Sequence, residues 1–159
     1  MNLERFREGH LEQFRKQCIV VEPDEYEVSF RLPPGSYNGI KINLPKIKEN
    51  SLFLKPPSSM YTPPKDCDII LLDADKNSFY LIEIKSLKKT CDFEKVKQQL
   101  EAGLEWLKFI CFCLDINFDD YNVFKVQTIA NSSRANYNKI LRIDDVYRTY
   151  GKQVTLVLE

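Results

Sequence analysis

The segments CDIILL (residues 67–72) and FYLIEIK (residues 79–85) decide the fold of this 159-residue chain. Both are dominated by β-branched, leucine and aromatic residues, a composition that is typical of buried strands. Six residues, most of them polar, separate the two segments. Because a short polar connector joins neighbouring antiparallel strands, the pair predicts a β-hairpin.

Charged side chains stand at the start of the first strand and at the end of the second. Side chains at positions i and i+2 share one face of a strand, so Glu83 and Lys85 project together. Asp68 opens the first strand, and antiparallel pairing places it beside the end of the second. The sequence therefore predicts that Asp68, Glu83 and Lys85 meet. The other face of the second strand is then buried and carries Tyr80, Ile82 and Ile84.

This group of residues suits one kind of chemistry. Two carboxylates held close together repel each other and attract a hard divalent cation such as Mg²⁺, which prefers oxygen ligands. Such an ion polarises a phosphoryl oxygen and lowers the pKa of a bound water. A neighbouring lysine can orient that water or stabilise developing negative charge. Two carboxylates and a lysine are thus typical of phosphodiester hydrolysis.

Apolar residues at helical spacing predict two helices. The first covers residues 3–17, and the second covers residues 92–114 with Asp92 as a natural cap for its first turn. On the second helix Gln99 lies at the border of the apolar stripe, whereas Gln98 lies almost opposite it. Gln99 is therefore expected to reach the sheet and to join the charged group.

Further strands and loops follow from alternation and from proline content. Alternating or apolar segments predict strands over residues 26–32, 39–44, 123–130 and 153–158. The first two of these are expected to pair as a hairpin. Loops are expected over residues 45–64, which hold five of the eight prolines, and over residues 131–138. We expect one domain, residues 1–159, with a core at about 1–130 and a strand extension at 131–159. Its class is α/β, a three-layer α-β-α sandwich around a mixed sheet.

Three stretches carry a resemblance to a known family: PKDCDIILL (residues 64–72), FYLIEIK (residues 79–85) and QQL (residues 98–100). Together they resemble the PD-(D/E)xK nuclease superfamily, which includes many restriction endonucleases, Holliday-junction resolvases and phage exonucleases. The resemblance implies a restriction-endonuclease-like core with the element order αβββαβ. It also implies four catalytic residues, namely Asp68, Glu83, Lys85 and Gln99. Asp68, Glu83 and the carbonyl group of Ile84 would then ligate the metal.

Two positions of the family pattern stay open. The proline of the family's name, Pro64, precedes Asp66 by two residues, so Asp66 competes with Asp68. We prefer Asp68 because it opens the apolar strand. Many members also carry a glutamate on the first helix, and both Glu4 and Glu8 lie near the apolar face predicted for residues 3–17.

Composition and charge limit the function classes. The 23 basic and 23 acidic residues cancel, so attraction to nucleic acid must come from local charge. The longest apolar run has six residues, against the ~20 that a membrane span requires. Five cysteines, an odd number, fit reduced thiols and a cytoplasmic location. Lysines on either side of the predicted site are expected to contact the phosphate backbone: Lys55, Lys65, Lys88 and Lys89.

The sequence thus predicts a nuclease that depends on Mg²⁺ or Mn²⁺, with DNA as the expected substrate. A chain of this size has little room for elements that read sequence, so we expect a homodimer or a larger complex. The alternative is a catalytically inactive domain of the same fold that binds nucleic acid or another protein.

Overall fold

The two apolar segments form a hairpin within a seven-stranded sheet of the computed structural model, which describes residues 6–21, 27–50, 65–86, 92–130 and 140–158. The strands β5 (Ile69–Asp73) and β6 (Ser78–Lys85) pair antiparallel, with Ile69 opposite Ile82. Asp73 closes the turn because its carboxylate accepts hydrogen bonds from the backbone N–H groups of Asp75 (3.0 Å) and Lys76 (3.2 Å). The hairpin predicted from the sequence is confirmed.

The large sheet is mixed. The strand β4 (Asn38–Ile42) pairs antiparallel with β1 (Leu11–Arg15) and with β5. In contrast, β6 pairs parallel with β7 (Asn122–Ile129), and β7 pairs parallel with β9 (Val146–Tyr150). This confirms the α/β class with a mixed sheet. The β5–β6 hairpin lies in the middle of the sheet. On one side of it are β4 and then β1, and on the other side are β7, then β9, then β8 (Leu141–Ile143).

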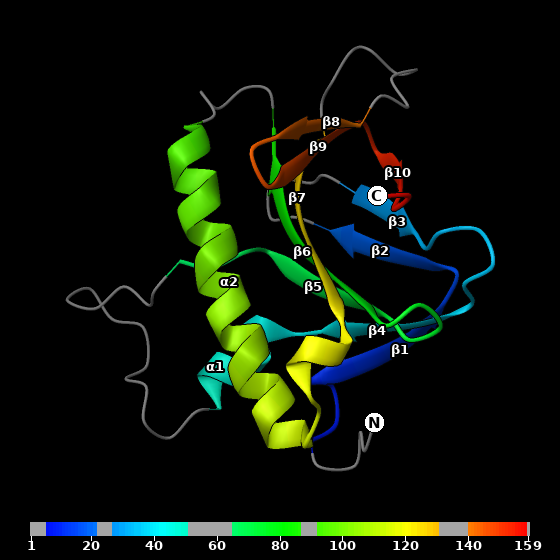
Figure 1. Cartoon of the computed structure of the whole chain (residues 1–159), viewed down its shortest axis with the longest axis vertical. Coiled ribbons are helices and arrows are strands. Elements are labelled where there is room, and N and C mark those ends of the chain that lie inside the picture. Colours follow the sequence, from blue (N-terminus) through cyan, green and yellow to red (C-terminus); the bar gives the residue numbers. More distant parts are fainter. Residues whose placement is uncertain (1–5, 22–26, 51–64, 87–91, 131–139, 159) are drawn as a thin grey trace.

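The long helix α2 (Phe93–Leu114) lies along one face of this sheet (Figure 1). Asp92 caps its first turn by accepting a hydrogen bond from the backbone N–H of Lys95. Its apolar stripe is buried against β4, β5 and β6 and includes Val96, Leu100 and Leu107. The helix predicted over residues 92–114 is therefore confirmed, and it connects the parallel strands β6 and β7.

A second sheet, of three strands, covers the opposite face. The strand β3 (Glu27–Arg31) lies between β2 (Gln17–Val21) and β10 (Gln153–Thr155). Its apolar side packs on the face of β5 and β6 that points away from α2. Among the described residues this face is thus covered by a sheet and not by a helix. The α-β-α layering that we expected is therefore not confirmed.

The helix predicted over residues 3–17 is wrong for the described part of that range. Residues 11–15 form β1, which pairs with β4, and residues 17–21 form β2. Lys16 separates the two strands with a left-handed φ of 58°, so the chain passes from one sheet to the other. Apolar residues spaced for a helix are here held as the strand β1 by pairing with the distant strand β4, which overrides local spacing.

The predicted pairing of residues 26–32 with residues 39–44 is also wrong. Both segments are strands, but β3 pairs with β2 and β10, whereas β4 pairs with β1 and β5. The break at Pro33-Pro34-Gly35 therefore leads from one sheet to the other, because Phe30 and Ile42 belong to different cores. No local turn signal could distinguish these two connections.

Part of the predicted proline-rich loop is a helix. The short helix α1 (Leu44–Glu49) begins after Asn43, whose side chain accepts a hydrogen bond from the backbone N–H of Lys46 at 3.2 Å. Pro45 lies in the first turn of this helix. Backbone N–H groups in the first turn have no acceptor within the helix, so a proline, which lacks an N–H, costs no hydrogen bond there. The rest of that loop, residues 51–64, and the loop at 131–138 lie outside the described residues.

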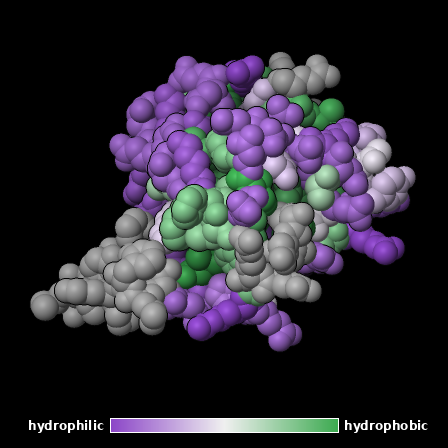
Figure 2. Space-filling model, turned by 60° about the horizontal axis from the view of Figure 1, so that its bottom comes forward, coloured by the Kyte–Doolittle hydropathy of each residue, from purple (hydrophilic) through white to green (hydrophobic). Residues whose placement is uncertain are grey.

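Several smaller features complete the described structure. The strands β8 and β9 were not predicted, and β10 is shorter than the range 153–158. A short 3-10 helix, η2 (Phe118–Asp120), leads into β7. The surface seen in Figure 2 is mostly hydrophilic, with a small group of hydrophobic side chains near its centre. None of the helices in the described ranges is long and apolar enough to cross a membrane.

Candidate active site

The two predicted carboxylates lie side by side at the end of the β5–β6 hairpin. Asp68 directly precedes β5, and its Oδ2 accepts a hydrogen bond from the backbone N–H of Ile84 at 2.6 Å. Glu83 lies in β6 with no exposed surface, on the face of the sheet that carries α2. The register of the hairpin, with Ile69 opposite Ile82, is what brings Asp68 next to Glu83.

Lys85 and Gln99 complete the predicted group. The Nζ atom of Lys85 forms an ion pair with Oε1 of Glu83 and donates a hydrogen bond to Oε1 of Gln99 at 3.3 Å. Gln99 is buried on α2, and its Nε2 donates to the carbonyl oxygen of Asp66 at 3.4 Å. The structure therefore brings Asp68, Glu83, Lys85 and Gln99 together, as the sequence predicted.

Burial is the main cause that raises the pKa values of both carboxyl groups. Burial, followed by the negative charge of Asp68, raises the pKa of Glu83 to about 8, although Lys85 acts in the opposite direction. Burial also raises the pKa of Asp68, against the hydrogen bond from Ile84 and the positive charge of Lys85. Two carboxylates that resist ionisation together form a site that added positive charge would stabilise.

One oxygen of Glu83 bears directly on metal binding. Its Oε2 is buried and accepts no hydrogen bond from a donor group of the described residues, and the Glu83 carboxyl lies within hydrogen-bonding reach of the Asp68 carboxyl. A buried carboxylate oxygen without a donor is costly, and a hard cation is one of the few groups that can satisfy it. The pair Asp68 and Glu83 therefore fits a divalent cation such as Mg²⁺, although the described residues contain no cluster of three or more His, Cys, Asp or Glu side chains suited to a metal.

Asp66, the competitor of Asp68, has a different partner. Its Oδ2 accepts from Nζ of Lys48, on α1, at 2.9 Å, and this ion pair is largely buried. The carboxylate of Asp66 is thus neutralised by its own lysine, while its carbonyl oxygen holds Gln99. Asp68 is the aspartate that stands beside Glu83, and Asp66 helps to position the glutamine.

Two polar residues that the sequence reasoning did not consider lie in line with the carboxylates. Gln127 of β7 is the register partner of Glu83, and Arg148 of β9 is the register partner of Gln127. The Nε atom of Arg148 donates to Oε1 of Gln127 at 2.8 Å. The only available signal was a charged residue inside the run VYRTY at residues 146–150, which was not recognised as a strand.

Comparison of the chain with family models, with curated proteins and with solved structures finds no match.

Two of the remaining predicted residues, Lys65 and Glu8, lie in the described part of the chain. Lys65 is exposed, one residue before Asp66. Glu8 is exposed in a turn before β1, so the expectation that it would project from a first helix is wrong. Four predicted residues lie outside the described ranges, namely Glu4, Lys55, Lys88 and Lys89.

Proposed function

We propose that the chain is a metal-dependent nuclease that hydrolyses phosphodiester bonds, with DNA as its substrate. The observation that carries this proposal is the pairing of Asp68 with a fully buried Glu83 whose Oε2 accepts no hydrogen bond from a donor group in the described part of the chain. A carboxylate pair that serves only as surface charge would be solvated. This pair is instead buried beside a lysine and a glutamine.

Asp68 and Glu83 would hold Mg²⁺ or Mn²⁺, and the carbonyl oxygen of Ile84, which lies between Glu83 and Lys85, is the proposed third ligand. A bound cation of this kind supplies positive charge to the carboxylates and the phosphoryl oxygen and lowers the pKa of a water. Its binding would also draw the remaining proton from the carboxyl pair, because the charged forms would then be favoured.

Lys85 would act on the attacking water and on the charge that develops on phosphate. Its ammonium group is held on one side by Glu83 and on the other by Gln99, while its side chain remains 26% exposed. An amine oriented by two partners and still open to solvent can meet a substrate without reorganising. Gln99 acts as a positioning residue, because it joins Lys85 to the backbone of Asp66.

The order of elements supports a restriction-endonuclease-like core as part of the same proposal. The strands β4, β5 and β6 form an antiparallel meander, and α2 then crosses to the parallel strand β7. This is the βββαβ part of the core that the family resemblance implies. We also propose that a homodimer, with one site in each copy, provides the second cut that duplex DNA requires.

A cleavage assay with matched variants tests the proposed function. Labelled single-stranded and duplex DNA and RNA are incubated with the protein in Mg²⁺, in Mn²⁺ and in EDTA. Wild-type protein is expected to cleave DNA only with metal, and E83Q and K85M are each expected to lose about a hundredfold or more of the rate. The controls E105Q and K108M alter an exposed ion pair of α2 and should retain the wild-type rate.

Four results would overturn all or part of the proposal. Cleavage that persists in EDTA would show that the reaction does not need a metal ion. Cleavage that survives both E83Q and K85M would show that this site does not catalyse it. Absence of cleavage from every substrate favours a domain of the same fold that binds nucleic acid or protein without cutting. Near-equal cleavage of RNA and DNA would overturn the choice of DNA alone.

A further inference from the structure

A row of four polar side chains crosses the large sheet on the side that faces α2. It runs from Asp68, before β5, through Glu83 on β6 and Gln127 on β7 to Arg148 on β9. We call these residues the transverse row. The two register pairs, Glu83 with Gln127 and Gln127 with Arg148, place consecutive members one strand apart. The row thus has two carboxylates at one end and a guanidinium group at the other.

Arg148 is held in place by two neutral groups. Its Nε donates to Gln127, and its guanidinium carbon lies 5.1 Å from the centre of the Phe93 ring at the start of α2. These contacts fix the plane of the guanidinium group and use one of its five N–H donors. No carboxylate of the described residues forms an ion pair with Arg148, so within the described structure its positive charge is not neutralised.

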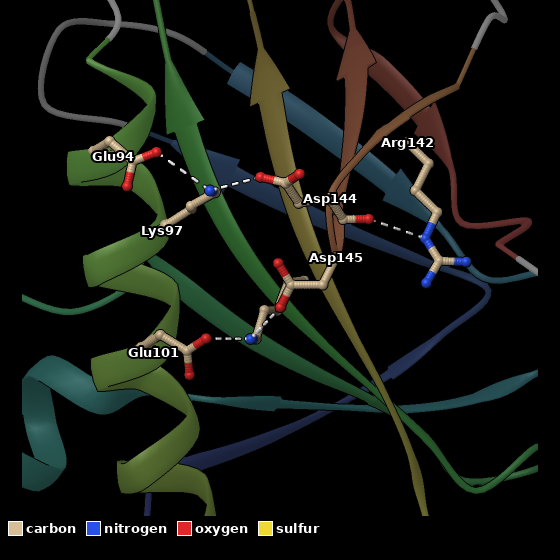
Figure 3. A network of polar contacts seen from close by, with 7 residues as sticks. Glu94, Lys97, Glu101, Arg142, Asp144 and Asp145 are labelled. Carbon is tan, nitrogen blue, oxygen red and sulfur yellow. Dashed lines mark hydrogen bonds and ion pairs between the residues drawn. The ribbon is translucent and has the colours of Figure 1, made fainter.

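The neighbouring cations on the same side of the sheet differ in this respect. Figure 3 shows Lys97 between Glu94 and Asp144. Lys125 forms ion pairs with Glu101 and Asp145. Each of these lysines has two carboxylate partners that link α2 to the turn between β8 and β9. Arg148 lies on β9 next to this network and takes no part in it, which points to a ligand and not to a structural ion pair.

We propose that Arg148 binds a phosphodiester adjacent to the one that is cleaved, an assignment that rests on the proposed nuclease function. Two strand spacings, about 10 Å, separate the backbones of β6 and β9. The Arg148 side chain covers part of this distance and is partly exposed. A guanidinium fork matches two phosphate oxygens, so the row sets one phosphate near Asp68 and Glu83 and the next at Arg148.

The arrangement predicts how Arg148 contributes. Arg148 is a binding residue and not a catalytic residue, because it lies two strands from the carboxylates. Its loss should therefore weaken DNA binding and raise KM, with little change in kcat. One phosphate contact also contributes a defined share of the salt dependence of binding, through release of counterions.

The test measures DNA binding and cleavage separately. Binding of a fluorescein-labelled DNA oligonucleotide is followed by anisotropy at several salt concentrations, in EDTA so that it is not cut. R148Q should weaken binding about tenfold and reduce the slope of log Kd against log salt by about 0.7–0.9, the share of one phosphate. R148K, which keeps the charge, should keep most of the slope. In Mg²⁺, KM of R148Q should rise while kcat stays within about threefold of wild type.

Arg142 provides a matched control. It is an exposed arginine on β8 whose guanidinium group lies over Tyr147, on the opposite side of the sheet from Arg148. R142Q should leave the affinity, the salt slope and KM unchanged. Thermal unfolding of R148Q and R148K identifies any variant that fails to fold. Because R148K keeps the positive charge, comparing its DNA affinity with that of R148Q shows whether weaker binding comes from the lost charge or from a folding defect.

The outcomes separate this inference from the proposed function. If the wild type cleaves DNA and R148Q behaves like R142Q, the phosphate contact is overturned and the nuclease stands. If the wild type binds DNA without cleaving it and R148Q reduces the slope, the nuclease is overturned and the contact stands. If R148Q lowers kcat about as much as K85M does, Arg148 acts on the cleaved phosphate and the proposed position is wrong.

Discussion

Glu83 is a completely buried carboxyl group beside a second carboxyl group, and this environment controls its titration. The pKa of Glu83 is raised from 4.5 to about 8, first by burial and then by the neighbouring charge of Asp68. Between these two pH values the folded protein keeps a proton that the unfolded chain releases. The folded state therefore loses stability as the pH rises from about 4.5 to about 8 in the absence of a cation.

The variant E83Q tests this pH dependence. Glutamine cannot ionise and still offers an oxygen to Lys85, so E83Q should be more stable than wild type at about pH 8 by roughly 2–4 kcal/mol. Near pH 4.5 the difference should become small. Urea unfolding in EDTA across this pH range measures both values, and the exposed variant E105Q is the control. If the stability of E83Q and of wild type depends on pH in the same way, the raised pKa of Glu83 is contradicted.

At the scale of elements, α2 lies close to the start of β5 because it carries a glycine there. A Cβ atom on Gly103 would lie far inside contact distance of the Sγ atom of Cys67 and 3.3 Å from its Cβ. Cys67 directly precedes Asp68, and Gln99 lies one turn before Gly103 on the same helix. This close packing of helix on strand is therefore what brings the glutamine to the carboxylates.

A double-mutant cycle at this contact tests the packing. Alanine favours a helix over glycine by about 1 kcal/mol, but overpacking a buried contact costs about 1–3 kcal/mol. G103A should therefore lower the free energy of unfolding in the wild-type chain, and should raise it in a C67A background. Chemical denaturation of the four proteins gives the coupling energy. Additive effects of the two substitutions would show that Cys67 and Gly103 do not constrain each other.

At the scale of the whole molecule, the candidate site exists only in the folded chain. Asp68 directly precedes β5, Glu83 lies on β6 and Gln99 lies on α2. The positions of these three elements depend on the two cores on either side of the large sheet. A cation that these residues bind would bind the folded state and not the unfolded state. Its binding free energy would then be added to the stability of the whole domain.

Metal-dependent stabilisation is the corresponding prediction. Mg²⁺ or Mn²⁺ at about 100 times its Kd should add about 2.7 kcal/mol to the stability of the wild type, and so raise Tm by several degrees. The variants E83Q and D68N should show little or none of this shift, whereas E105Q should show all of it. Differential scanning calorimetry with and without EDTA measures the effect. A shift of the same size in E83Q would place the cation elsewhere.

The central elements of this molecule were predictable because their signals are local. The strands β5, β6 and β7 and the capped helix α2 carry strong apolar patterns, and the site follows from a short hairpin. The strand β2 was not predicted, although its partner β3 is close to it in the sequence. The strand β1 was not predictable, because its partner β4 lies far along the chain. Arg148 was missed for the same reason, since its place in line with Glu83 depends on parallel pairing of β6, β7 and β9.

The sequence by itself determined that Asp68 and Glu83 would meet. The short connector makes the two strands a hairpin, and antiparallel pairing then sets the start of the first strand beside the end of the second. The sequence also determined the long helix and the position of Gln99 on that helix. Only the tertiary structure decided that a second sheet covers the face opposite α2, that Asp66 pairs with Lys48, and that Glu83 is fully buried. Burial, layering and long-range pairing depend on which distant segments compete for the same apolar surface, and that competition is settled only when the whole chain packs.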